Sequence, residues 1–236
     1  MNIIVGCPIR NRAWIFQEWV EAVQIAFEVA GEKPTFAFEV GLDEGYKDDG
    51  TGAMVVDLAR TEPVIYSRLV EGPIPAERKP WNGHRYLQIV DARNRLLRTV
   101  RGQEPDLFFS VDSDILLHPT ALLVLLESIK KFDAVSGKAY LGMHRSFVTY
   151  AFHKSAGGLQ RQDQDGVFPV EIIMALKLMK PTAYNVDYEY NQFGEDIGWS
   201  DACRAQGLTL GFDGRVCSKH CMYPEDLDKV DNRLGW

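Results

Sequence analysis

The sequence has no apolar stretch as long as a membrane span and few of the features that mark an exported protein. A membrane-spanning helix needs about 18 consecutive apolar residues, and no segment of the chain reaches that length. Residues 1–7 carry no basic segment and no cleavage site, so we predict a first strand there and no signal peptide. Four cysteines in 236 residues do not suggest a disulfide scaffold, and we expect free thiols and a cytoplasmic location.

An excess of basic residues is also absent. The chain has 26 lysines and arginines against 33 aspartates and glutamates, which gives a net charge of −7. This balance argues against a broadly basic nucleic-acid-binding surface, although a local basic patch is compatible with it. There is no internal repeat, no low-complexity segment and no shift in composition that would mark a domain boundary. We therefore predict one domain over residues 1–236, which is long enough to bury a core.

Apolar periodicity predicts alternating strands and helices in the first half of the chain. We expect strands at residues 2–7, 35–40, 64–70 and 107–111, and helices at 13–30, 53–60, 85–101 and 121–132. This alternation predicts an α/β fold with a Rossmann-like, mostly parallel central sheet flanked by helices. The second half is less regular, with strands expected at 134–140 and 146–153, a polar loop at 155–166, and either strand or helix at 170–179.

The most informative motif is a pair of carboxylates that directly follows an apolar segment. Residues 107–111 (Leu-Phe-Phe-Ser-Val) predict a buried strand, and Asp112 and Asp114 come immediately after it. Open α/β sheets bind their ligands at the carboxyl ends of the strands. Two hard oxygen donors at such a place suit Mg²⁺ or Mn²⁺, and these cations bind phosphate oxygens. The motif therefore predicts a phosphorylated ligand.

The same Asp-x-Asp spacing occurs at two other places, without the same context. Asp163 and Asp165 lie in a polar stretch, and Asp226 and Asp228 lie in a charged segment near the C-terminus. No apolar strand precedes either pair, and runs of charged residues are usually solvated. We therefore assign the binding role only to the first pair.

Six short segments follow one another in a definite order along most of the chain. They are residues 7–14 (Cys-Pro-Ile-Arg-Asn-Arg-Ala-Trp), 43–44 (Asp-Glu), 91–95 (Asp-Ala-Arg-Asn-Arg), 110–115 (Ser-Val-Asp-Ser-Asp-Ile), 194–201 (Gly-Glu-Asp-Ile-Gly-Trp-Ser-Asp) and 219–220 (Lys-His). In this order they resemble the motifs of the GT-A class of nucleotide-sugar glycosyltransferases, close to the large inverting family with a single Rossmann-like domain. Each segment alone is weak evidence, and the ordered set is strong.

The resemblance implies that residues 1–118 bind a nucleotide-sugar donor, most often UDP-linked, together with Mn²⁺ or Mg²⁺. Asp114 is then the more direct metal ligand, Asp112 holds the metal's water or hydroxyls of the sugar and ribose, and His220 completes the coordination. A divalent cation and nearby arginines would stabilise the charge that develops on the departing diphosphate. The implied donor-binding residues are Pro8, Arg10, Arg12, Asp43, Arg93, Asn94 and Asp112.

The resemblance also implies that residues 119–236 hold the acceptor and the catalytic base. Asp196 is the expected base, which removes the proton of the acceptor hydroxyl, and Glu195 orients the acceptor. Because carboxylates at a helix start also satisfy unpaired amides, simple capping is the alternative for both residues. A base without an obvious nucleophile favours a single displacement with inversion, and retention is the competing mechanism.

Several alternatives can be weighed from the sequence. Cys217, His220 and Cys221 suggest zinc, but a closed zinc site needs four ligands and Cys203 is the nearest fourth. A nucleotidyltransferase normally has a glycine-rich loop after the first strand, whereas residues 8–12 contain no glycine. A non-catalytic binding module is disfavoured by the intact acidic pairs. The acceptor stays open between a protein, a glycan, a small molecule and a hydroxylated DNA base, and the net charge disfavours the last.

Overall fold

In the computed structural model, which describes residues 1–43, 49–71, 83–141, 147–148, 151–155, 158–162 and 164–227, the first half forms a parallel sheet. Its strands are β1 (Ile3–Ile9), β2 (Thr35–Asp43), β3 (Val64–Glu71) and β4 (Leu107–Val111). The helices between them are α1 (Phe16–Val29), α2 (Thr51–Leu58) and α3 (Gly83–Arg101). The four strands lie in the order β4-β1-β2-β3. This arrangement confirms the predicted α/β fold with a mostly parallel sheet.

The second half of the chain extends the same sheet beyond β4. Its strands continue in the order β12 (Leu176–Met179), β6 (Ala134–Leu141), β13 (Leu210–His220) and β10 (Val167–Val170). β12 is antiparallel to both β4 and β6, and β13 runs parallel to β6. The short strands β5 (Ile115–Leu116) and β7 (Phe147–Val148) pair with β13 and β6. The halves on either side of residue 118 therefore share one sheet.

A second sheet of three strands lies beside the main one. It contains β11 (Ile172–Ile173), β8 (Ala151–Ser155) and β9 (Gly158–Arg161), in that order. The prediction of a loop over 155–166 is wrong at β9, because all four of its residues are exposed and leave no apolar alternation to detect. Segment 170–179, for which the sequence left strand and helix open, contains two strands, β11 and β12. Ala175 lies between them with a φ of 55°.

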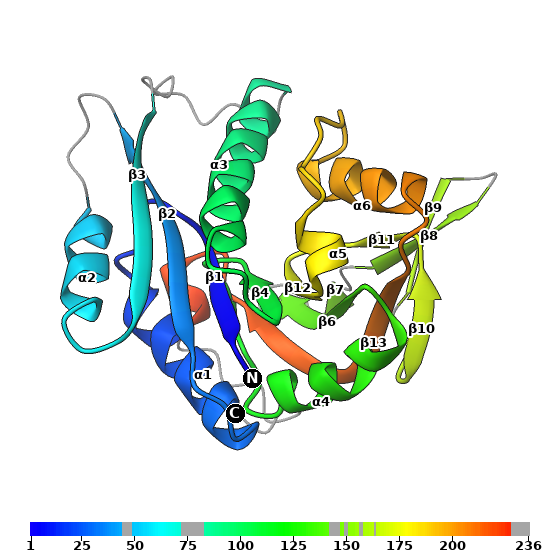
Figure 1. Cartoon of the computed structure of the whole chain (residues 1–236), viewed down its shortest axis with the longest axis horizontal. Helices are drawn as coiled ribbons and strands as arrows, with labels where there is room; N and C mark the ends of the chain where they lie inside the picture. Colours follow the sequence, from blue (N-terminus) through cyan, green and yellow to red (C-terminus); the bar gives the residue numbers. More distant parts are fainter. Residues whose placement is uncertain are drawn as a thin grey trace.

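The side chains of each central strand alternate between two apolar cores. On β1, Val5 and Cys7 face the core formed with α1 and α4 (Ala121–Ser128), whereas Ile4 faces the opposite core. The opposite core contains α3, α5 (Pro181–Tyr184) and α6 (Glu195–Ala205). Figure 1 shows α1 and α4 on one side of the sheet and α3, α5 and α6 on the other. None of the helices in the described ranges is long and apolar enough to cross a lipid bilayer.

Candidate functional site

The acidic motif after β4 lies in a turn that hydrogen bonds hold in place. The indole N–H of Trp19 on α1 donates to the Asp112 carbonyl at 3.0 Å. The Asp112 N–H donates to the Ala175 carbonyl at 3.2 Å, and the Cys221 N–H donates to the Asp114 carbonyl at 2.8 Å. Groups from α1, the start of β12 and the end of β13 therefore fix the backbone that carries both carboxylates. This is the carboxyl end of β4, where the sequence predicted a ligand site.

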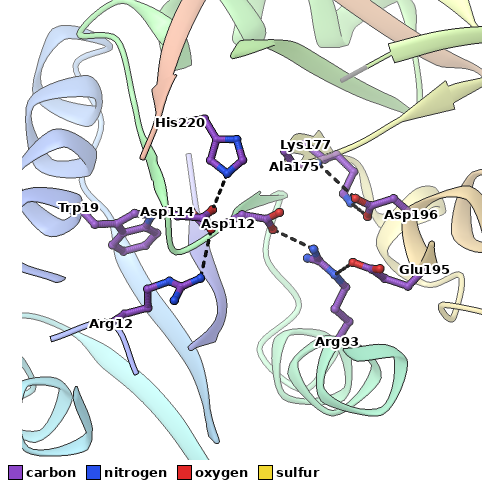
Figure 2. Close-up of polar contacts among 10 residues, drawn as sticks. All are labelled: Arg12, Trp19, Arg93, Asp112, Asp114, Ala175, Lys177, Glu195, Asp196 and His220. Atoms are coloured by element: carbon purple, nitrogen blue, oxygen red, sulfur yellow. Dashed lines mark hydrogen bonds and ion pairs between the residues drawn. The ribbon is translucent and has the colours of Figure 1, made fainter. Parts of the chain in front are cut away.

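Asp114 is held between two nitrogen-bearing side chains. The Arg12 Nη2 atom lies 3.2 Å from one of its oxygens, and the His220 Nε2 atom lies 3.4 Å from the other. His220 reaches this position because the end of β13 pairs with β5, with His220 opposite Ile115. Burial raises the pKa of the Asp114 carboxyl, but His220 and Arg12 outweigh it, and the net pKa lies below its usual value. Figure 2 shows Asp114 between the side chains of Arg12 and His220.

Arg93 joins the acidic motif to the start of α6. Its Nη2 atom lies 2.8 Å from Asp112 Oδ1, and its Nε atom donates to Glu195 Oε1 at 3.1 Å. Only 6% of the Arg93 surface is exposed. Burial raises the pKa of the Asp112 and Glu195 carboxyls, and repulsion by Asp196 adds to both shifts. Arg93 thus links residues far apart in sequence across the site, as Figure 2 shows.

Asp196 forms a separate ion pair, with a residue that the sequence analysis did not single out. Its Oδ1 atom pairs with the ammonium of Lys177 on β12, and its Oδ2 atom accepts the Ala175 N–H at 3.3 Å. The only sequence signal for Lys177 was a lysine inside the otherwise apolar run 172–179. Burial raises the pKa of the Asp196 carboxyl, but Lys177 and Arg93 lower it by more than burial raises it. The net pKa therefore lies below its usual value.

Of the other predicted donor-binding residues, Pro8 and Arg10 lie at the carboxyl end of β1, and Asn94 is hydrogen-bonded to the protein backbone. Pro8 lies near the end of β1, and Arg10 follows that strand, where burial lowers the pKa of its guanidinium. Asn94 contacts the protein backbone, since its amide donates to the Tyr188 carbonyl at 3.0 Å and accepts the Tyr188 N–H at 2.7 Å. Asp43 is the last residue of β2, and its side chain lies outside the described residues.

The structure separates the zinc ligands that the sequence suggested. Cys221 packs in the core that contains α1 and α4, whereas Cys203 packs in the core on the other face of the sheet. Cys217 contacts the Ser218 carbonyl at 3.7 Å. Among the residues that the structure describes, no three histidine, cysteine or acidic side chains form a group that could hold a metal.

A cation that takes most of its ligands from phosphate and water still fits this site. Mg²⁺ typically uses one or two carboxylates together with substrate phosphates and several waters, and Mn²⁺ also accepts imidazole. Asp114 and His220 supply a carboxylate oxygen and an imidazole nitrogen 3.4 Å apart, while Asp112 is directed toward Arg93. The donor set therefore suits a metal that binds together with a diphosphate, and it does not form a closed protein cage.

Comparison with known proteins identifies similar structures but no sequence relatives. No family model matches the chain, and no curated protein sequence matches it. The structure of S. aureus TarS in complex with UDP is similar with a TM-score of 0.60, at 14% identity over 96% of this chain. The TarS complex with UDP-GlcNAc gives 0.58 at 13% identity over 98% of the chain, and A197 from STIV gives 0.50 at 11% over 95%.

The length of the similar structures differs from that of this chain. The alignment covers 62% of the TarS chain and 87% of A197. At these sequence identities, the likeness shows a common α/β fold, with a central, mostly parallel sheet flanked by helices. The fold class predicted from the sequence is thus confirmed by the similar structures as well as by the strand order.

The geometry predicts very different roles for two arginines on α3. Arg93→Met would leave the buried Glu195 carboxylate and the partly exposed Asp112 carboxylate without their shared cation, and breaking a buried pair typically costs about 3–5 kcal/mol. Arg95 is the matched control, because it is exposed and its ion pair is with Asp91 on the same helix. Arg95→Met should change the free energy of unfolding by less than about 0.5 kcal/mol. Urea unfolding measures both, and equal effects would contradict the bridging role of Arg93.

Proposed function

We propose that this protein is a metal-dependent glycosyltransferase that moves a sugar from a UDP-linked donor to an acceptor hydroxyl with inversion. The observation that carries the proposal is the meeting of two acidic pairs at one sheet edge. Asp112 and Asp114 come from the end of β4, Glu195 and Asp196 come from the start of α6, and Arg93 bridges the two pairs. The shared fold with TarS, which binds UDP and UDP-GlcNAc, supports a nucleotide sugar as donor.

The donor side of the site is built to hold a diphosphate. Asp114 and His220 would hold the cation, which supplies positive charge to the departing diphosphate. Arg12 pairs with Asp114, and Arg93 pairs with Asp112. Two of their nitrogens, Arg12 Nε and Arg93 Nη1, are buried and have no hydrogen-bond partner among the residues that the structure describes. A buried donor without an acceptor is costly, so both nitrogens suit a ligand with several oxygens. A diphosphate meets this requirement.

The acceptor side supplies a proton acceptor. In the proposed reaction, the acceptor O–H bond breaks, its proton passes to Asp196, and the oxygen forms a bond to the anomeric carbon. The bond between that carbon and the diphosphate oxygen breaks in the same displacement, and the diphosphate leaves with the electron pair. Glu195 lies beside Asp196 at the start of α6 and would orient the acceptor hydroxyl. General-base catalysis of this kind typically contributes about 10²–10⁴-fold to the rate.

The donor assignment predicts metal-dependent binding of UDP. UDP should raise the melting temperature in the presence of Mn²⁺ or Mg²⁺ and have little effect in EDTA. Ligand binding stabilises the folded state by about 2.7 kcal/mol when the ligand is at 100 times its Kd. Asp114→Ala should abolish this shift, whereas Asp57→Ala on the exposed face of α2 should retain it. An undiminished shift in Asp114→Ala would overturn the metal assignment.

The base assignment predicts that binding and turnover separate in Asp196→Asn. This variant should keep the metal-dependent UDP shift and lose sugar transfer by at least about 10²-fold. Asp201→Asn, farther along α6 and partly exposed, is the control and should transfer sugar at a rate close to the parent's. Initial rates of UDP release with a panel of acceptors provide the measurement. Transfer by Asp196→Asn within a few-fold of the parent would remove Asp196 from this role.

A single displacement also predicts the configuration of the product. The acceptor oxygen attacks the face opposite the departing diphosphate, so an α-linked UDP-sugar should give a β-glycoside. For a gluco- or galacto-configured sugar, the anomeric proton coupling constant distinguishes the two products. A large coupling is expected, and a small coupling from an α-linked donor would mean retention and new roles for Glu195 and Asp196.

A further inference from the structure

Lys177 is a fully buried cation in the middle of a central strand. None of its surface is exposed, and its neighbours Leu176 and Leu178 pack into the core on the other face of the sheet. Lysine is almost never fully buried unless it is paired, because an ammonium ion loses its hydration on burial. An apolar residue would complete this core position at a lower cost. The lysine therefore requires an explanation beyond the packing of β12.

The surroundings of the Lys177 ammonium combine one carboxylate with two aromatic rings. Its Nζ atom pairs with Asp196, and it lies 5.2 Å from the ring centroid of Tyr188 and 5.4 Å from that of Trp199. The two rings are stacked on each other, with centroids 5.8 Å apart. Aromatic faces attract a desolvated cation, and they also exclude water from the pair. The ammonium is thus held in place on the side of the site that carries Asp196.

Both oxygens of Asp196 receive donors from the same short segment. Lys177 binds Oδ1, and the Ala175 N–H binds Oδ2. Ala175 adopts a φ of 55°, a left-handed conformation that is uncommon for alanine. Two donors spaced along residues 175–177 fix the plane of the carboxylate, as Figure 2 shows. The start of β12 therefore sets the orientation of Asp196.

Charged and titratable groups on several elements face Asp196. Lys177 on β12 and Arg93 on α3 are cationic, Glu195 on α6 and Asp112 after β4 are anionic, and Tyr188 lies in the segment before α6. Arg93 bonds to both Asp112 and Glu195. Lys177 bonds to Asp196 instead. The carboxylates of Asp112, Glu195 and Asp196 repel one another. Because Arg93 binds two of them, Lys177 is a cation that Asp196 does not share with the other two carboxylates.

We propose that Lys177 is a positioning residue that keeps Asp196 ionised and oriented to accept the proton of the acceptor hydroxyl. The catalytic part of this inference rests on the proposed function. An ammonium ion has no lone pair, so Lys177 cannot accept that proton, and its effect passes through Asp196. Burial alone would raise the pKa of the Asp196 carboxyl, and the Lys177 charge is the largest influence that lowers it.

Lys177→Met, which keeps the length of the side chain and removes its charge, tests the catalytic role. The acidic limb of the pH profile of kcat/KM should move to higher pH, because Asp196 then becomes protonated more readily. Metal-dependent UDP binding should persist. Lys177→Met should cause no further loss of activity in an Asp196→Asn background, since the two changes act through one group. Lys180→Met, directly after the same strand, is the control and should retain the parent profile.

The pH dependence of stability tests the ion pair without any need for turnover. In the parent, the lowered pKa of Asp196 gives stability that is present above the unfolded pKa of about 3.9 and lost as pH falls through the folded pKa. Without Lys177, ionised Asp196 is destabilising at pH 7, and protonation relieves this as pH falls. The difference in melting temperature between parent and Lys177→Met should therefore be larger at pH 7 than at pH 5.

The double variant Lys177→Met/Asp196→Asn should recover part of the stability at pH 7, because it removes both charges. A melting-temperature difference that is the same at both pH values, with no recovery in the double variant, would overturn the assignment of Lys177. An unmoved acidic limb, or an equal loss of activity in the Asp196→Asn background, would refute its catalytic role. A parent that transfers no sugar but shows the expected stability pattern would refute the proposed function and leave the ion pair established.

Discussion

Buried charge is the constraint on which the arrangement of this site depends. Glu195 and Asp196 are buried and Asp112 is partly buried, and a carboxylate withdrawn from water is costly without a cation. Arg93 and Lys177 supply the cations from opposite sides, one from α3 and one from β12. The positions of these helices and strands are therefore coupled, because a shift of any one element would separate a buried pair.

The order of strands in the sheet makes this coupling possible. β12 runs antiparallel between β4 and β6, so the start of β12 lies next to the end of β4. The pairing of Leu176 with Val111 brings Lys177 to the same edge as the acidic motif. Asn94 adds a second connection, since its amide holds the Tyr188 backbone of the segment that leads into α6. Close packing continues along α6, where a side chain at Gly198 would meet the Glu189 carbonyl.

The sequence singled out those residues of the candidate site that have local signals. Asp112 and Asp114 stood out because an apolar strand precedes them, and Glu195 and Asp196 stood out because they open a helix within an ordered set of motifs. Lys177 had no such signal, since its partner is distant in sequence and only the sheet pairing brings the two together. Asn94 belonged to a motif, yet its hydrogen bonds to Tyr188 depend on the packing of a segment whose path the sequence does not define. β9 was missed because its strand pairing leaves every side chain exposed.

The position of β12 also bears on how the chain folds during synthesis. β4 has five buried residues, and it pairs with β1 on one side and with β12 on the other. Until residues 176–179 leave the ribosome, β4 is an unpaired edge strand of the parallel sheet. Exposed apolar edge strands pair readily with other chains. A fragment that ends at residue 118 would keep this edge permanently open. Residues 1–118 consequently depend on the second half of the chain to cover this edge, and they are a poor unit for recombination or fusion.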